Sequence, residues 1–437
     1  MTGPSSRTPL ETPVAPISEW KVVQGGIVVA VGLAVGQLLG FIRHATLAYL
    51  LGTAPQADAV AVAFAPIDLL WAVLSTALIF GYGPMLAARD SASYHDLARP
   101  VLQLAFLTAA AILLLSPWMV RLLAPGLPPD TAALAAGLLR VSALAIPAVA
   151  WSTMLTAVLY SERRFAFPAF HHGMVNLSIV VAALALDRPL GPYGFALGYA
   201  AGAWLQLAAA AVVSRPLLRA RAPRARPAAL AALAQPVPVL VYSALIPLMP
   251  AVTRALASTF GPGATAAFDY SLKLVGVPLA WLVVPLSSSL LSEIAPFRLR
   301  QDRQAALSAI RRAAMATALA AGAIIVLITA LAPWLVAVLF ERGRFSAAST
   351  ATVTAILSGF CPALAAWSVL DIISRSLFAL GSPRVPLLAA AVALVANILI
   401  SLLAPMRSVG AIGAGAVAGF SAAALLAAFY LRSLRRA

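Results

Sequence analysis

Charged residues and cysteines are scarce in this chain of 437 residues. Only 10% of its residues are charged and 62% are hydrophobic, whereas soluble proteins average about 25% charged and 45–50% apolar residues. The single cysteine, Cys361, excludes an intrachain disulfide, a thiolate metal cluster and a paired redox motif. The composition therefore excludes an ordinary soluble protein and indicates a polytopic membrane protein.

Motifs of soluble catalytic sites are also absent from the sequence. It contains no Walker-type phosphate loop, no His-Glu-x-x-His helix and no paired cysteines. We therefore expect no enzymatic activity, no catalytic residues, no metal and no bound cofactor. Because a nucleotide fold is missing, the energy for any work by the protein would come from a coupling cation, the membrane potential or the substrate itself.

Acidic residues number 14 against 30 lysines and arginines, which gives a formal net charge of +16. The basic residues lie between hydrophobic runs, so we expect them to set membrane orientation rather than to bind nucleic acid. With a cytoplasmic N-terminus, most arginines fall on one side of the membrane, and the other side keeps Arg121, Arg188, Arg342, Arg344 and Arg407. The positive-inside rule then places both termini in the cytoplasm.

Long hydrophobic runs make up most of the chain. Crossing a bilayer core of about 30 Å takes roughly 20 apolar residues, and unpaired backbone in lipid is costly enough that such runs form helices. The sequence therefore predicts an all-α polytopic membrane protein with about 12 transmembrane helices. The expected helices cover residues 22–51, 57–87, 98–123, 131–160, 165–186, 193–213, 229–260, 265–294, 306–340, 346–380, 386–404 and 410–434.

Two segments of low hydrophobicity suggest how the chain is divided. Residues 1–17, rich in Ser, Thr and Pro, are expected to form a disordered cytoplasmic tail, and residues 215–227, with alternating Arg, Ala and Pro, a basic cytoplasmic linker. Between them, residues 18–214 would form an N-lobe of six helices. Residues 228–437 would form a C-lobe of six more.

The two predicted lobes share a pattern of charges. Arg43 and Asp58 are fifteen positions apart in the first, and Arg254 and Asp269 are fifteen apart in the second. Because each half contains an even number of predicted spans, both copies enter the membrane from the same side. This indicates parallel repeats related by an axis along the membrane normal, with a cavity between the lobes.

Charges inside the hydrophobic runs are the candidates for a binding site. A charge near the bilayer centre costs at least about 2.5–3.5 kcal/mol, so it normally faces a cavity or a partner. Arg43, Arg254 and Lys273 belong to the first helix pair of each lobe and are predicted to line one cavity. The planar guanidinium fork suits phosphate, so we expect an anionic ligand. Asp58 and Asp269 are predicted to have a supporting or gating role. The alternative is that Arg43–Asp58 and Arg254–Asp269 are structural ion pairs at helix ends, in which the two acids only orient the arginines.

Other intramembrane charges carry weaker predictions. Asp371 and Arg375 are one helical turn apart, so a local salt bridge is the simplest interpretation, and a supporting or gating role is the alternative. Asp68 is expected at a solvated helix terminus rather than at a cation site.

Several short motifs resemble a known family. Residues 40–44 (GFIRH), 51–52 (LG) and 57–64 (ADAVAVAF) resemble the opening of the MurJ (MviN) family of lipid II flippases. The similarity continues, in the family's order, at residues 138–140, 164–170, 254–258, 270–274, 339–345 and 375–381. The resemblance therefore extends over nearly the whole chain.

The resemblance implies a flippase of the multidrug/oligosaccharidyl-lipid/polysaccharide exporter superfamily. Such a protein moves an undecaprenyl-diphosphate-linked saccharide, lipid II of peptidoglycan synthesis first, across the inner membrane by alternating access. By this analogy Arg43 and Lys273 would bind the diphosphate, and Asp58 matches a family acid near the outer end of the cavity. The implied partners are the lipid-linked saccharide, membrane lipids and proteins of cell-wall or polysaccharide synthesis.

The chain also departs from the family pattern. His44 stands where the family has Asp, Lys273 where it usually has Arg, and Asp371 where it usually has Lys. Residues 69–75 (LLWAVLS) lack the family's arginine pair and glutamate. We also expect no counterpart of the two additional C-terminal helices of many members. The alternatives are a flippase for an exopolysaccharide or O-antigen unit, a cation-coupled drug exporter, a membrane glycosyltransferase, and a scaffold without transport activity.

Overall fold

The computed structural model describes residues 19–76, 94–219, 237–299, 303–403 and 408–436. In these residues the regular secondary structure consists of helices joined by short turns. The predicted tail and most of the predicted linker lie outside these residues. The first half contains α1 (Glu19–Leu51), α2 (Pro55–Thr76), α4 (Tyr94–Leu123), α5 (Pro129–Ala143), α6 (Ile146–Ser161), α7 (Ala166–Leu190) and α8 (Tyr193–Arg219). The second half contains α10 (Val237–Ala257), η2 (Ser258–Phe260), α11 (Ala264–Leu299), α12 (Arg303–Phe340), α13 (Ala347–Ala379), α14 (Arg384–Leu403), η3 (Val409–Gly413) and α15 (Ala414–Arg436).

Most of these helices are long enough to cross a membrane. Ten of them meet the length and hydropathy needed for a span, and the bent pair α5 and α6 would make eleven. The helix α11, with 36 residues, also exceeds the roughly 20 residues that a bilayer requires. The predicted all-α polytopic membrane fold is therefore confirmed.

The one long helix predicted over residues 131–160 is instead two helices. α5 and α6 meet at an angle of 41°, so the prediction of a single helix was wrong. Pro147 lies in the first turn of α6, where proline is tolerated. In the interior of one continuous helix it would have no N–H to donate, and its ring would clash with the carbonyl four residues earlier. At the break, two backbone hydrogen bonds span three residues each: Leu144 N donates to Val141 O at 3.2 Å, and Ala145 N donates to Ser142 O at 3.0 Å.

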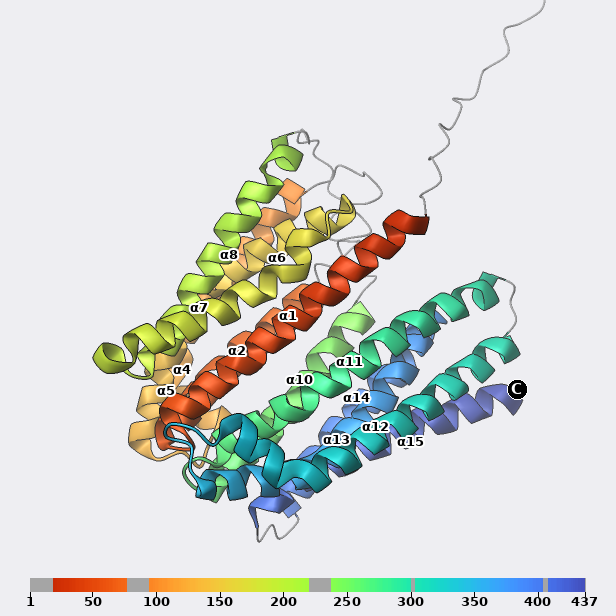
Figure 1. The fold of residues 1–437 in the computed structure, drawn as a ribbon. Coiled ribbons are helices and arrows are strands. Elements are labelled where there is room, and N and C mark those ends of the chain that lie inside the picture. Colours follow the sequence, from red (N-terminus) through yellow and green to blue (C-terminus); the bar gives the residue numbers. More distant parts are fainter. Residues whose placement is uncertain (1–18, 77–93, 220–236, 300–302, 404–407, 437) are drawn as a thin grey trace, which may run out of the picture.

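The helices are arranged in two bundles that diverge from one end of the molecule (Figure 1). The first bundle contains α1, α2 and α4–α8, and the second contains α10–α15. Helices at equivalent positions in the chain order of the two bundles have equivalent neighbours. In the first bundle α1 packs against α7 and α2 against α5, and in the second bundle α10 packs against α14 and α11 against α13. This packing agrees with the predicted repeat, whose symmetry axis stays a prediction.

The bundles meet where α1 joins α2, α10 joins α11 and α12 joins α13 (Figure 1). We call this contact the inter-bundle seam. Its hydrogen bonds run from Arg344 N to Tyr49 O at 2.9 Å, from Tyr270 Oη to Gly52 O at 2.8 Å, and between the hydroxyls of Thr53 and Ser349 at 2.8 Å. The seam closes one end of the space between the bundles.

Asp58 contributes the seam's charged contact. Its side chain is fully buried, and its two carboxylate oxygens accept hydrogen bonds from Gly263 N at 2.6 Å and Ala266 N at 2.7 Å. These N–H groups begin α11, where they have no partner within the helix and the helix dipole favours negative charge. A carboxylate of the first bundle thus caps a helix of the second.

The turn at Gly263 allows this close approach. Its φ of +86° lies in the left-handed region, and a Cβ there would lie 2.8 Å from Thr53 Cβ. Gly52, on the other side of the seam, also has a positive φ of +59° and would bring a Cβ to 3.0 Å from the carbonyl carbon of Arg344. Both turns therefore require glycine, for backbone conformation and for space.

Candidate anion-binding cavity

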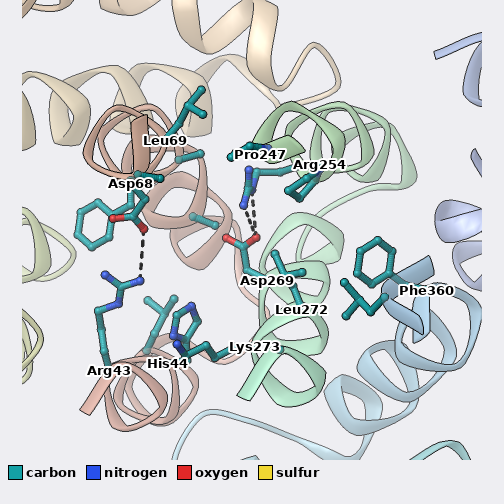
Figure 2. A pocket seen from close by; sticks show the side chains of 18 of the residues that line it. Arg43, His44, Asp68, Leu69, Pro247, Arg254, Asp269, Leu272, Lys273 and Phe360 are labelled. Carbon is teal, nitrogen blue, oxygen red and sulfur yellow. Dashed lines mark hydrogen bonds and ion pairs between the residues drawn. The ribbon is translucent and has the colours of Figure 1, made fainter. Parts of the chain in front are cut away.

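A cavity of about 510 Å³ lies between the bundles, beside the seam. Its charged and polar wall is formed by α1, α2, α10 and α11 (Figure 2). The side chains on this wall are Gln37, Arg43, His44, Asp68, Arg254, Asp269 and Lys273. Apolar residues also line the cavity, and those from the end of the second bundle's sequence are Phe360, Leu364 and Trp367 of α13 and Phe420 of α15.

Arg254 and Asp269 form a tight ion pair across the α10–α11 connection. Arg254 donates from Nε at 3.0 Å and from Nη2 at 2.7 Å, both to Asp269 Oδ1. The two side chains are only 11% and 12% exposed. The ion pair expected from the fifteen-residue spacing is thus present in the second bundle.

Arg43 does not pair with Asp58, so the alternative of a structural ion pair is wrong for the first bundle. α1 and α2 are joined by a short connection and run antiparallel. Arg43 lies eight residues before the end of α1, about 12 Å along its axis, whereas Asp58 lies in the first turn of α2. Arg43 therefore lies beside a later part of α2, and Asp58 faces α11.

Asp68 is the acidic partner of Arg43. Arg43 Nη2 lies 3.4 Å from Asp68 Oδ2, and Tyr199 of α8 donates its hydroxyl to Asp68 Oδ1 at 2.8 Å. Arg43 also lies over the ring of Phe64, 5.7 Å from the centroid. The expectation that Asp68 caps a solvated helix terminus was wrong, because α2 continues to Thr76.

Lys273 has a different environment from the two arginines. Its Nζ donates to Gln37 Oε1 at 3.0 Å, and among the described residues it forms no ion pair with an acid. The cavity thus contains three basic side chains and two acidic ones, and its net charge is +1 when His44 is neutral. A net positive cavity attracts anions and repels cations.

His44 adds no negative charge to this wall. Its Nδ1 lies 2.8 Å from Gly40 O. A carbonyl oxygen only accepts, so Nδ1 carries the proton in this bond and Nε2 of the neutral ring is left as an acceptor. The residue at this position therefore does not repel an anion as an aspartate would.

The comparison with known families shows to which family the chain belongs. The family described as "Lipid II flippase MurJ" matches residues 47–437, which is most of the chain. The chain belongs to the MurJ family of lipid II flippases. This is a family of transporters and not of catalytic enzymes.

Individual relatives agree with the assignment to the MurJ family. A protein of Rhizobium meliloti (strain 1021) named "Probable lipid II flippase MurJ" is 27% identical over 417 residues, which cover 89% of this chain and 77% of that protein. The solved "Lipid II flippase MurJ, inward closed conformation" has a TM-score of 0.78 at 19% identity and covers 93% of this chain and 87% of that one. An inward-facing transporter of the MATE family has a TM-score of 0.76 at 14% identity, with 93% and 99% covered. The MurJ fold and that of the wider transporter superfamily are thus shared.

The structure brings together some of the predicted site residues and separates others. Arg43, Arg254, Lys273 and Asp269 line one cavity (Figure 2). Asp58 lies at the seam, and Asp371 and Arg375 form an ion pair of 2.7 Å within α13 that does not line the cavity.

The sequence interpretation missed Gln37 and Tyr199, and it placed Asp68 at a solvated helix terminus instead of in the cavity. Asp68 offered a signal, since it is an acid in the middle of an apolar run. Tyr199 offered none, because its partner is 131 positions away in the chain.

Proposed function

We propose that this protein translocates lipid II, an undecaprenyl-diphosphate-linked saccharide, across the inner (cytoplasmic) membrane by alternating access. The observation that carries the proposal is the presence of Arg43, Arg254 and Lys273, from both bundles, around one cavity of net positive charge in a MurJ-family chain. The diphosphate is the anion in this ligand class. The transported lipid leaves chemically unchanged, so no catalytic residue is needed.

The three cations would act together on the diphosphate. Arg43 comes from the first bundle, and Arg254 and Lys273 come from the second. Guanidinium groups offer two parallel N–H donors to phosphate oxygens, and the ammonium group adds a compact charge. A diphosphate bound between them would attract both bundles, so its differential contacts would favour one orientation over the other.

We infer that the cavity opens to the cytoplasm in this structure. The bundles diverge at the end where α1 begins and α15 ends (Figure 1). With both termini in the cytoplasm, as the positive-inside rule requires, the seam lies on the periplasmic side. Transport then needs the seam to open and the opposite ends to close, driven by the membrane potential or a coupling cation. Membrane lipids would surround the polyprenyl tail, and proteins of wall synthesis are the candidate partners.

A cation-coupled drug exporter fits this cavity less well. A cationic drug would enter a site of net positive charge, in which both acids already face arginines. A flippase for another polyprenyl-diphosphate saccharide would use the same cations and must be distinguished by experiment.

The test is complementation of a bacterial strain depleted of its own lipid II flippase. Wild type should restore growth, whereas Arg43→Ala and Lys273→Ala should not, although all three reach the membrane in equal amounts. Arg375→Ala is the matched control, because Arg375 is also an ion-paired arginine inside a helix but does not line the cavity. Failure of well-expressed wild type would exclude lipid II and favour another lipid-linked saccharide, and growth with both cavity variants would refute the site.

A further inference from the structure

We propose that Asp68 is an internal competitor of the substrate diphosphate for Arg43. In this arrangement Arg43 exchanges its carboxylate partner for the diphosphate on binding, and takes the carboxylate back on release. The inference deepens the proposed function, on which it rests. It assigns Asp68 and Tyr199 a part in setting affinity and release.

Asp68 has a second partner besides Arg43. Its Oδ1 accepts the hydroxyl of Tyr199 at 2.8 Å, and Oδ2 faces Arg43 Nη2 at 3.4 Å. Tyr199 is fully buried in the first bundle, where its ring packs edge-on against Phe64 with centroids 5.0 Å apart. Because a rigid donor holds one oxygen, the carboxylate stays at the cavity wall after Arg43 has moved away.

The two ion pairs of the cavity (Figure 2) differ in length and in exposure. Arg254 and Asp269 share two hydrogen bonds of 2.7 and 3.0 Å and are about one-tenth exposed. Arg43 and Asp68 share a single contact of 3.4 Å, and the Asp68 side chain is 44% exposed. A long, partly exposed pair contributes much less than a short, shielded one. Arg43 is therefore the arginine that a ligand can detach from its acid.

The negative charge of Asp68 affects both the binding and the release of the diphosphate. A diphosphate held by Arg43 lies next to the Asp68 carboxylate, and two like charges at this range repel each other. Asp68 therefore weakens binding twice, since it occupies Arg43 before binding and repels the anion afterwards. The same repulsion speeds release on the far side of the membrane.

Neutralising Asp68 should thus raise affinity and slow turnover. Loss of a partly exposed ion pair together with one near repulsion corresponds to an affinity gain on the order of tenfold for Asp68→Asn. In a translocation assay, both KM and the maximal rate should fall. A residue that only maintained the fold would lower the rate without improving KM.

The test measures binding of farnesyl diphosphate, a short polyprenyl diphosphate, to the purified full-length protein by calorimetry. Asp68→Asn should bind farnesyl diphosphate about tenfold more tightly than wild type. Tyr199→Phe, which removes the hydroxyl that holds the Asp68 carboxylate, should change the affinity less than Asp68→Asn does. Asp371→Asn is the matched control: it removes the same charge from another Asp–Arg pair, outside the cavity, and should leave the affinity unchanged. Equal melting temperatures would show that the variants are folded.

A double-mutant cycle separates competition from a general charge effect. The gain from Asp68→Asn should shrink when Arg43 is already replaced by Ala. Unchanged or weaker binding by Asp68→Asn, no binding by either protein, or an equal gain with and without Arg43 would each overturn the inference.

Translocation of lipid II separates this inference from the proposed function. Wild type that translocates lipid II, with no affinity change in Asp68→Asn, would overturn the inference alone. Tighter binding by Asp68→Asn, in a protein that never translocates lipid II, would refute the substrate and support the competition.

Discussion

Asp58 should control how often the seam opens. Its two bonds to the backbone N–H groups of Gly263 and Ala266 join the bundles only in the closed arrangement. Hydrogen bonds to a charged group contribute about 1.5–3 kcal/mol each, so Asp58→Ala should destabilise the closed seam by on the order of 3 kcal/mol. That corresponds to a roughly 100-fold increase in the ratio of open to closed molecules.

The increase in the fraction of open molecules can be measured as the reactivity of a cysteine buried in the seam. Ser349 is 4% exposed there and is paired with Thr53, so Ser349→Cys should react with a membrane-impermeant maleimide only when the seam opens. The single native thiol is removed first as Cys361→Ala. While the open form is rare, the labelling rate is proportional to its population, so adding Asp58→Ala should raise the rate about 100-fold.

A matched control removes a buried carboxylate elsewhere. Asp371→Ala deletes an acid of similar burial that pairs within its own helix, so the labelling rate should not change. An unchanged rate in Asp58→Ala would refute the assignment of Asp58 as a bond between the bundles. An equal rise in Asp371→Ala would show that loss of stability, and not the seam, controls the labelling.

Two further predictions concern the cavity. Arg254→Ala should leave the buried Asp269 carboxylate without its partner, and breaking a buried ion pair costs about 3 kcal/mol. The melting temperature should therefore fall, and the double variant Arg254→Ala/Asp269→Asn should regain part of the lost melting temperature. His44→Asp should cancel the net charge of +1 in the cavity and weaken farnesyl diphosphate binding on the order of tenfold, while the neutral His44→Asn should bind like wild type. An unchanged melting temperature for Arg254→Ala, or equal binding by His44→Asp and His44→Asn, would contradict these predictions.

What the sequence could predict depended on how far apart the interacting residues are. Helices follow from local hydrophobic length, and the Arg254–Asp269 pair lies within one pair of neighbouring helices, so both were accessible from spacing. The break at Pro147 was also a local signal, although the hydrophobic run on both sides concealed it.

Long-range contacts could not be predicted in this way. The backbone partners of Asp58 are more than 200 positions away in the chain, and they depend on how the two bundles meet. The role of Asp68 depends on Tyr199, which reaches it from another helix. Spacing alone therefore assigned Arg43 to the wrong acid, whereas the position of Arg43, Arg254 and Lys273 inside hydrophobic runs correctly predicted that they line one cavity.

The most direct test of the account is translocation of fluorescent lipid II by the purified protein in liposomes, measured as the fraction accessible to an external quencher. Wild type and Arg375→Ala should translocate lipid II at similar rates, and Arg43→Ala and Lys273→Ala should fall to the rate of protein-free liposomes. Translocation by the two cavity variants at the wild-type rate would contradict the claim that these cations hold the diphosphate during transport.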